Sequence, residues 1–195
     1  MARRSDHSPA DLRRMILAEG HRHLADVGFG RFSAREVARR IGYSVGTVYN
    51  VFGTLDRLFY ELNTITMRRW ADLTERRLKA SGSDRLDAMV DIYFEFASAN
   101  RNLWEAIWAH RWPRGEPPPE EAEHDRSRLT GMVIAEIAAA LPAARRGEAD
   151  ELARSLIATV HGHCDCALSG AFMLMGQADP VSLAKSRVRD ALRWA

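Results

Sequence analysis

The chain has 195 residues, of which 46% are hydrophobic and 28% are charged, and its formal net charge is +2 at pH 7. This length allows one or two domains with a sizeable core, and so small a net charge does not by itself indicate a nucleic-acid partner. Its 2 cysteines exclude a disulfide framework, and the polar start and the lack of a long apolar run predict a cytoplasmic protein without a membrane partner.

Apolar residues recur at spacings of three and four rather than two, which predicts an all-α fold. A first helix is expected from Asp11 to Val27, with Gly28 and Gly30 ending it. No repeat and no low-complexity tract interrupts the pattern. The N-terminal region is therefore expected to begin with one amphipathic helix.

Two short helices should follow. The segment from Ser33 to Glu36 has the form of a capping box, in which the serine hydroxyl accepts a first-turn N–H and the glutamate reaches back to the cap residue. Gly42 ends this second helix, and Ser44 is placed to cap a third one that ends near Phe52. Two short helices joined by a tight turn are typical of a helix-turn-helix.

The rest of the chain predicts a larger bundle. A long fourth helix opens at Thr54 or Asp56, and further helices are expected at about 85–100, around Leu103 to Trp108, and at about 120–141, 147–170 and 180–194. The proline-rich stretch 113–119 is a helix-breaking connector. The sum is about nine helices, divided into a three-helix domain at 1–54 and a helical body at 55–195.

The third helix has two different faces. Val45, Val48 and Phe52 share a face that should bury against the first two helices. The outward face carries Gly46, Thr47, Tyr49 and Asn50, whose hydroxyl, ring and amide groups suit phosphates and base edges. Residues 1–57 contain ten arginines and six acidic residues, a local balance of +4 that leaves about −2 for the remainder. This distribution favours phosphate binding by the N-terminal segment.

The run FSAREVARRIGYSVGTVYNVFGTLDRLF resembles the DNA-binding domain of the tetracycline-repressor-like (TetR) family of bacterial regulators, and the match covers about residues 10 to 60. The resemblance implies an all-α homodimer with one DNA-binding head and one effector-binding body per subunit, which binds a palindromic operator on double-stranded DNA. It also implies that Ser33 and Arg35 meet the DNA backbone and that Thr47, Tyr49 and Asn50 form the recognition helix. The full expected DNA-binding set is Ser33, Arg35, Ser44, Gly46, Thr47, Tyr49, Asn50 and Arg57.

One position departs from the family pattern. The family commonly has Phe-x-x-Lys after the recognition helix, and the lysine contacts a phosphate. Here Leu55 takes that place, and Arg57 lies two residues further on. Either Arg57 replaces the lysine, or the chain makes one fewer phosphate contact and binds DNA with a weaker salt dependence.

The body contains two sets of candidate ligand-binding residues. Trp104, Trp108 and Trp112 recur at every fourth position, which fits either a packed core or the wall of an apolar pocket. The residues expected to line an effector pocket are Tyr93, Trp104, Trp108, His110 and His161. On a helix, His161, Cys164 and Asp165 also share a face, so a metal site, a thiol sensor and ordinary helix packing are all open.

The last two long helices, near Leu156 and Val188, have apolar faces that in the family form the dimer interface, although packing within one chain is also open. We therefore expect a repressor that a small-molecule effector releases from its operator, with no cofactor, no metal ligand and no enzymatic activity. The alternatives are a metal- or thiol-responsive regulator and a small helical enzyme, both built on His161, Cys164 and Asp165.

Overall fold

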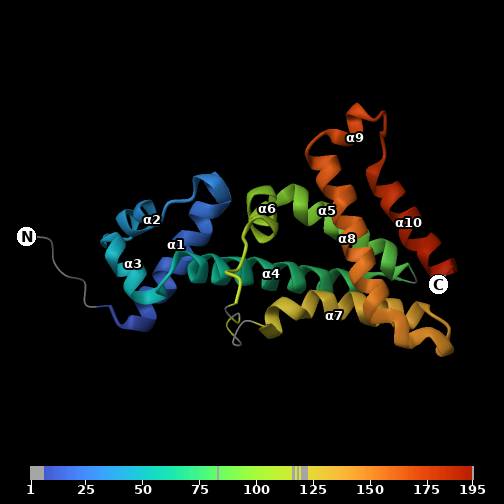
Figure 1. Cartoon of the computed structure of the whole chain (residues 1–195), viewed down its shortest axis with the longest axis horizontal. Helices are drawn as coiled ribbons and strands as arrows, with labels where there is room; N and C mark the ends of the chain where they lie inside the picture. Colours follow the sequence, from blue (N-terminus) through green and yellow to red (C-terminus); the bar gives the residue numbers. More distant parts are fainter. Residues whose placement is uncertain (1–6, 83, 116, 118, 120–122, 195) are drawn as a thin grey trace, which may run out of the picture. The chain divides into compact units, whose positions relative to one another are not determined.

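The computed structural model describes residues 7–82, 84–115, 117, 119 and 123–194. Ten α-helices and two 3-10 helices form the regular structure within these ranges, and none of the residues in them forms a strand (Figure 1). The predicted all-α fold is confirmed. The chain divides into two compact units, the first made of residues 1–66 and 100–122 and the second of residues 67–99 and 123–195.

The first unit contains α1 (Pro9–Val27), η1 (Phe29–Arg31), α2 (Ala34–Arg40), α3 (Val45–Phe52), the first part of α4 (Leu55–Ala80) and α6 (Arg101–Ala109). Ser8 caps α1 by accepting the N–H of Asp11, and Gly28 ends the helix with a φ of 77°. The core of the unit takes side chains from its α-helices: Ile16, Leu24, Val37, Val48, Phe52, Leu58, Leu62 and Leu103. Helix α6 is fixed further by the Asn102 side-chain amide, which donates to the carbonyl of Ala25 over 2.7 Å.

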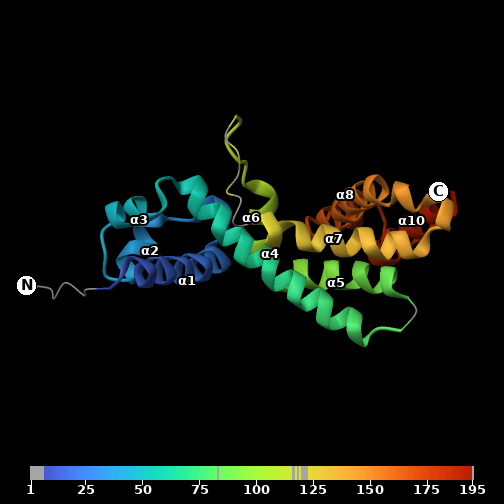
Figure 2. The same cartoon turned by 90° about the horizontal axis from the view of Figure 1, so that it is seen from below.

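The second unit contains the rest of α4, then α5 (Arg85–Ala99), α7 (Glu123–Ala140), η3 (Ala143–Glu148), α8 (Ala149–Leu168), α9 (Ala171–Leu174) and α10 (Pro180–Trp194). Helix α8 packs against α5, α7 and α10, and Figure 2 shows these helices gathered into one bundle. Trp70 of α4 stacks on Phe96 of α5, with ring centroids 4.7 Å apart and an interplanar angle of 3°. This stacking joins α4 to the bundle.

Several helix boundaries differ from the sequence prediction, and α1 begins at Pro9 rather than at Asp11. The expected start of α7 at residue 120 lies outside the described residues, which begin again at Glu123. Helix α8 begins at Ala149 rather than at residue 147, because η3 occupies the preceding residues. The four-residue α9 was not predicted and brings the α-helices of the described ranges to ten rather than about nine. Within those ranges no helix has the length and apolar character needed to cross a membrane.

Candidate nucleic-acid interface and ligand cavity

The turn between α2 and α3 is held by backbone hydrogen bonds. The N–H of Tyr43 donates to the carbonyl of Ala38 over 2.9 Å, and Gly42 between them has a φ of 80°. This is the bonding pattern of a helix end closed by a left-handed glycine, a conformation that other residues rarely adopt. The turn fixes the angle at which α3 leaves α2.

The start of α2 contains only half of the predicted capping box. The hydroxyl of Ser33 accepts the N–H of Glu36 over 3.3 Å, as expected. The carboxylate of Glu36 does not reach back, because it pairs with Arg39 and Arg40 at 2.7–2.8 Å. Arg39 first, and then Arg40, lower the pKa of Glu36 to about 2. The N–H of Ser33 donates instead to Nε2 of His23.

The inner face of α3 is anchored as predicted. Val48 and Phe52 are buried, with exposed fractions of 2% and 4%, and Val45 is half-buried against the same core. The guanidinium of Arg13 lies over the ring of Phe52, 4.8 Å from its centroid, and also pairs with Glu61. These contacts hold α3 against α1 and α4.

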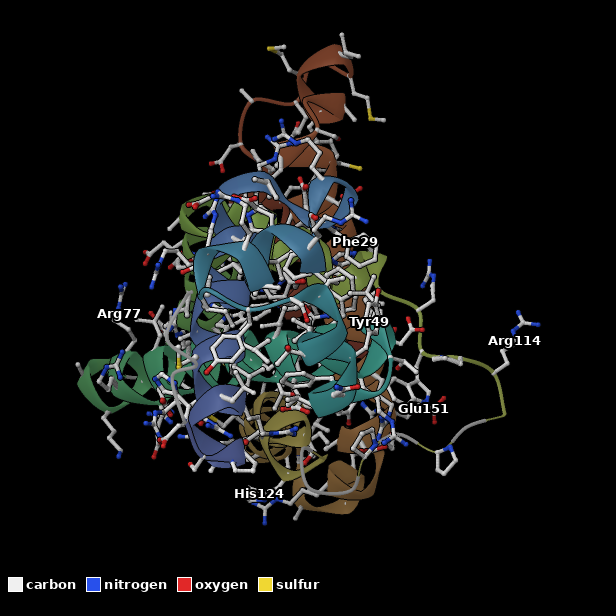
Figure 3. All side chains as sticks on the ribbon, turned by 90° about the vertical axis from the view of Figure 1, so that its left-hand side faces the viewer. Phe29, Tyr49, Arg77, Arg114, His124 and Glu151 are labelled. Atoms are coloured by element: carbon white, nitrogen blue, oxygen red, sulfur yellow. The ribbon has the colours of Figure 1, made fainter. Side chains whose placement is uncertain are left out.

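The outer face of α3 is open at most of the expected positions. Gly46, Tyr49 and Asn50 are exposed, with 43% of Tyr49 accessible, and Figure 3 views the end of the unit on which Tyr49 lies. Thr47 is half-buried, and its hydroxyl lies 3.2 Å from the hydroxyl of Ser44. Ser44 occupies the N-cap position, but its side chain bonds to no backbone N–H there. Three of the four residues predicted to face outward on α3 are therefore exposed, and Thr47 is the exception.

The beginning of α4 lies next along the chain. Thr54 accepts the N–H of Arg57 over 3.2 Å and so caps the helix. Leu55 is half-buried and packs on the core of the first unit, whereas the side chain of Arg57 is exposed. On α2, Arg35 is exposed and Ser33 is half-buried. Among the predicted DNA-binding residues, Arg35 and Arg57 therefore present exposed cations.

The residues expected to line an effector pocket fall into two separate groups. Tyr93 of α5 and His161 of α8 meet in the second unit, where the tyrosine hydroxyl lies 3.1 Å from Nδ1 of the histidine. Trp104, Trp108 and His110 belong to the first unit. There Trp104 is 1% exposed, Trp108 is exposed, and His110 lies 3.3 Å from Asp56.

The second unit contains an apolar cavity of about 60 Å³. Tyr93 is the only one of the five predicted pocket residues among its lining residues. The others are aliphatic or methionine side chains from four helices: Leu86, Met89, Val90, Val133, Ile137, Leu156, Ile157, Val160 and Val188. Sequence reasoning missed them because an apolar helix face looks the same whether it packs fully or leaves a cavity.

The His161–Cys166 segment forms part of α8. Cys164 is fully buried, and burial, with the neighbouring Asp165 adding to it, raises the pKa of its thiol to about 12. Burial lowers the pKa of His161 against the opposing effect of Asp165. His163 contacts the carbonyl of Thr159 at 2.8 Å. In the part of the chain that the structure describes, no three His, Cys, Asp or Glu side chains come together in a way that could hold a metal ion.

Comparison with known families gives two matches. Residues 86–190 match the model described as "Tetracyclin repressor-like, C-terminal domain", and residues 16–62 match "Bacterial regulatory proteins, tetR family". Together the two matches include both the α2–α3 helix pair and the helices that line the cavity. No curated protein matches the chain.

Three solved structures share the fold over nearly the whole chain. A protein of unknown function from Rhodococcus sp. RHA1 is 23% identical, with 98% of each chain covered and a TM-score of 0.71. The putative regulatory protein SCO4313 is also 23% identical, with 94% of this chain and 96% of that chain covered and a TM-score of 0.69. The multidrug binding protein EbrR, complexed with imidazole, is 19% identical, with 98% and 97% covered and a TM-score of 0.63.

Proposed function

Since the chain belongs to the TetR family of DNA-binding transcriptional regulators, we propose that it is a repressor that leaves a palindromic operator when a small-molecule effector binds. Residues 1–54 would form the DNA-binding head, and residues 55–195 the effector-binding and dimerising body. A regulator of transcription acts where the DNA is, so we place it in the bacterial cytoplasm. No enzymatic activity is part of this proposal.

The main support for the proposal is that α3 has one buried face and one exposed face. Its buried face leaves Gly46, Tyr49 and Asn50 open to solvent on a short helix that follows a fixed turn. Such a helix can enter the major groove, where an amide can pair with an adenine edge and a phenol can reach a phosphate. We assign the flanking phosphate contacts to Ser33, Arg35 and Arg57, and the start of the helix to Ser44 and Thr47.

A palindromic operator requires a two-fold symmetric protein. The exposed face of α8 carries small side chains at Ser155, Ala158 and Gly162, and a Cβ added at Gly162 would meet no atom within 4 Å. A second copy of the helix can approach such a face closely. We therefore place the homodimer interface on α8 and α10.

The effector would bind in the second unit, at the cavity beside Tyr93. An effector that binds more tightly to a conformation with misplaced DNA-binding heads lowers the affinity for the operator by the same coupling free energy. EbrR, which shares the fold, is described as a multidrug binding protein and contains imidazole. That likeness of fold supports a ligand site in this chain, and the cavity is the reason for placing it in the second unit.

Footprinting on the DNA that flanks the gene for this chain tests the proposal. We expect one protected palindrome, and we expect the double variant Tyr49→Phe/Thr47→Ala to lose protection while keeping its helical circular dichroism and its dimer mass. Trp108→Phe, an exposed aromatic on α6 of the same unit, is the matched control and should protect as the parent does. Protection that is unchanged in the double variant would overturn the assignment of α3.

A further inference from the structure

We propose that the cavity between α5, α7, α8 and α10 selects a small, uncharged and mainly apolar effector that has at most one hydrogen-bonding group. This inference rests on the proposed function, because it names the chemical class of the effector at that same site. It follows from four properties of the second unit: the composition of the cavity wall, the ion pairs between the helices that form it, the polar pair at Tyr93, and the volume of the cavity.

The cavity wall cannot compensate a charge. Nine of its ten lining residues have no side-chain oxygen or nitrogen, and the tenth is Tyr93. An ion that enters such a wall loses its hydration and gains no partner of opposite charge. The wall therefore disfavours a carboxylate, a phosphate or an ammonium ion, whereas an aliphatic or aromatic body replaces water favourably.

Ion pairs join the helices that form the cavity to one another. Arg85 of α5 binds the carboxylate of Glu136 of α7 through two nitrogens, at 2.6 and 2.8 Å. Lys185 of α10 pairs with Asp91 of α5 at 2.6 Å. A charged ligand that recruited any of these groups would break an ion pair between two of the helices that form the cavity.

The one polar side chain of the cavity wall, Tyr93, is paired with His161, which is not among the lining residues. The hydroxyl of Tyr93 lies 3.1 Å from Nδ1 of His161, and the Tyr93 ring is held edge-on against Trp70, with centroids 4.8 Å apart. Burial lowers the pKa of His161, so the imidazole is neutral near pH 7. A phenol hydroxyl can both donate and accept a hydrogen bond. Tyr93 therefore suits a ligand hydroxyl or carbonyl group better than an ion.

The cavity volume sets the size of the ligand. At about 60 Å³, it has room for about four to six water-sized groups on a scale where one water needs about 10–15 Å³. A ligand of about six heavy atoms fits without displacing a helix. We expect ligands of this size to bind with dissociation constants from about millimolar to about micromolar.

The test uses three probes of equal chain length: 1-pentanol, pentanoate and pentylammonium. Binding to the full chain is measured by titration calorimetry and by thermal shift at pH 7. We expect 1-pentanol to bind at least about 10-fold more tightly than either ion, and to weaken operator binding measured by fluorescence anisotropy.

Two variants locate the binding. Val133→Phe places a ring in the cavity and should abolish the response to 1-pentanol, whereas Ala135→Phe, at an exposed position two residues away on α7, should keep it. Tyr93→Phe keeps the shape of the wall and gives a second test if Val133→Phe does not fold. It should weaken 1-pentanol about 3- to 10-fold and leave 1-chloropentane, which lacks the hydroxyl, unchanged.

Four results would overturn the inference: an ion that binds as tightly as 1-pentanol, no binding by any of the neutral probes, undiminished binding in a folded Val133→Phe, or binding that leaves operator affinity unchanged. A chain that protects no DNA in the footprinting experiment contradicts the proposed function instead. The two failures are distinguishable because probe binding is measured without DNA.

Discussion

The backbone N–H of Ser33 donates to Nε2 of His23, 3.3 Å away, so that a side chain of α1 bonds to the cap residue of α2. His23 is 4% exposed, and its ring lies 5.4 Å from that of Phe32. This bond takes the place of the one that a capping box would give to Glu36. The carboxylate of Glu36 is thereby available to Arg39 and Arg40.

We expect His23→Leu to lower the free energy of unfolding by about 1–3 kcal/mol, because the N–H of Ser33 would lose its acceptor while the apolar contact with Phe32 stays. Urea denaturation followed by circular dichroism measures the change. His23→Gln is the matched control, since an amide oxygen can still accept the bond, and it should lose less than His23→Leu. Equal losses in the two variants would mean that packing of the ring, and not the bond, matters.

The carboxylate of Glu36, which pairs with Arg39 and Arg40, gives a second comparison in the same experiment. In the His23→Leu background, Glu36 can turn back to the N–H of Ser33 and restore the capping box. Glu36→Ala, which has no side-chain acceptor, should therefore cost more stability in that background than in the parent chain. An identical cost in both backgrounds would show that Glu36 does not replace His23.

Much of the fold could be predicted because its signals are local. Gly28 and Gly42 mark helix ends through their positive φ, and Ser33 marks a helix start through its hydroxyl, which accepts the N–H of Glu36. The buried face of α3 was also predictable, because Val48 and Phe52 lie on one side of any helix that contains them.

The rest depends on which segments pack together, and periodicity does not contain that information. Trp104 and His110 follow Tyr93 closely in the sequence, yet residues 100–122 belong to the first unit and Tyr93 to the second. Hydrogen bonds from Asn63 to Ala106 and from Asn102 to Ala25 secure α6 in the first unit. A single helix pattern shows that a face is buried but not against which partner.

Arg57 is the residue whose loss should alter the salt dependence of operator binding. It lies exposed in the first turn of α4, whereas Leu55, at the usual lysine position, is packed on the core. We expect Arg57→Ala to reduce the slope of log K against log salt by about 1 and to weaken all DNA sequences equally, as the loss of one phosphate contact does.

Arg77→Ala is the control, because Arg77 is an exposed cation in the second unit that pairs with Glu95. Anisotropy titrations at several salt concentrations should give the parent slope for this variant. An unchanged slope in Arg57→Ala would mean that the chain makes one phosphate contact fewer than its family usually does.

Cys164 should be chemically inert at neutral pH. Burial raises the pKa of its thiol to about 12, so the thiolate needed for alkylation or oxidation forms only far above pH 7. We expect mass spectrometry after iodoacetamide treatment to find Cys166, which is half-buried, modified before Cys164. Cys164→Ala should leave the effector response unchanged. A loss of response that appears only with oxidant or added metal would support the sensor alternative.

Ion pairs join α4 and α7, and each helix supplies an arginine that binds carboxylates of the other. Arg128 of α7 binds Asp72 at 2.7 Å and also Glu75, both on α4. In the reverse direction, Arg68 of α4 binds Asp125 of α7 at 2.5 Å. Because α7 also lines the cavity, these pairs fix the position of one cavity wall relative to α4.

We expect Arg128→Gln to lower the midpoint temperature of unfolding by on the order of 2 °C at pH 7 and low salt, since each pair is partly exposed and worth little alone. Lys79 first, and then Arg128, hold the pKa of Glu75 below its ordinary value. A carboxylate with a lowered pKa in the folded state stabilises the fold above its unfolded pKa, and this stability is lost as the pH falls.

The difference between Arg128→Gln and the parent should therefore shrink when the pH falls below about 4, where Asp and Glu side chains take up protons. It should also shrink in high salt. Thermal denaturation at pH 7 and pH 3, each in low and in high salt, measures both effects. Arg154→Gln is the matched control, because it breaks an exposed pair with Asp150 within α8 alone. If Arg154→Gln lowers the midpoint temperature as much as Arg128→Gln does, the pairs between α4 and α7 stabilise the fold no more than an exposed pair within one helix.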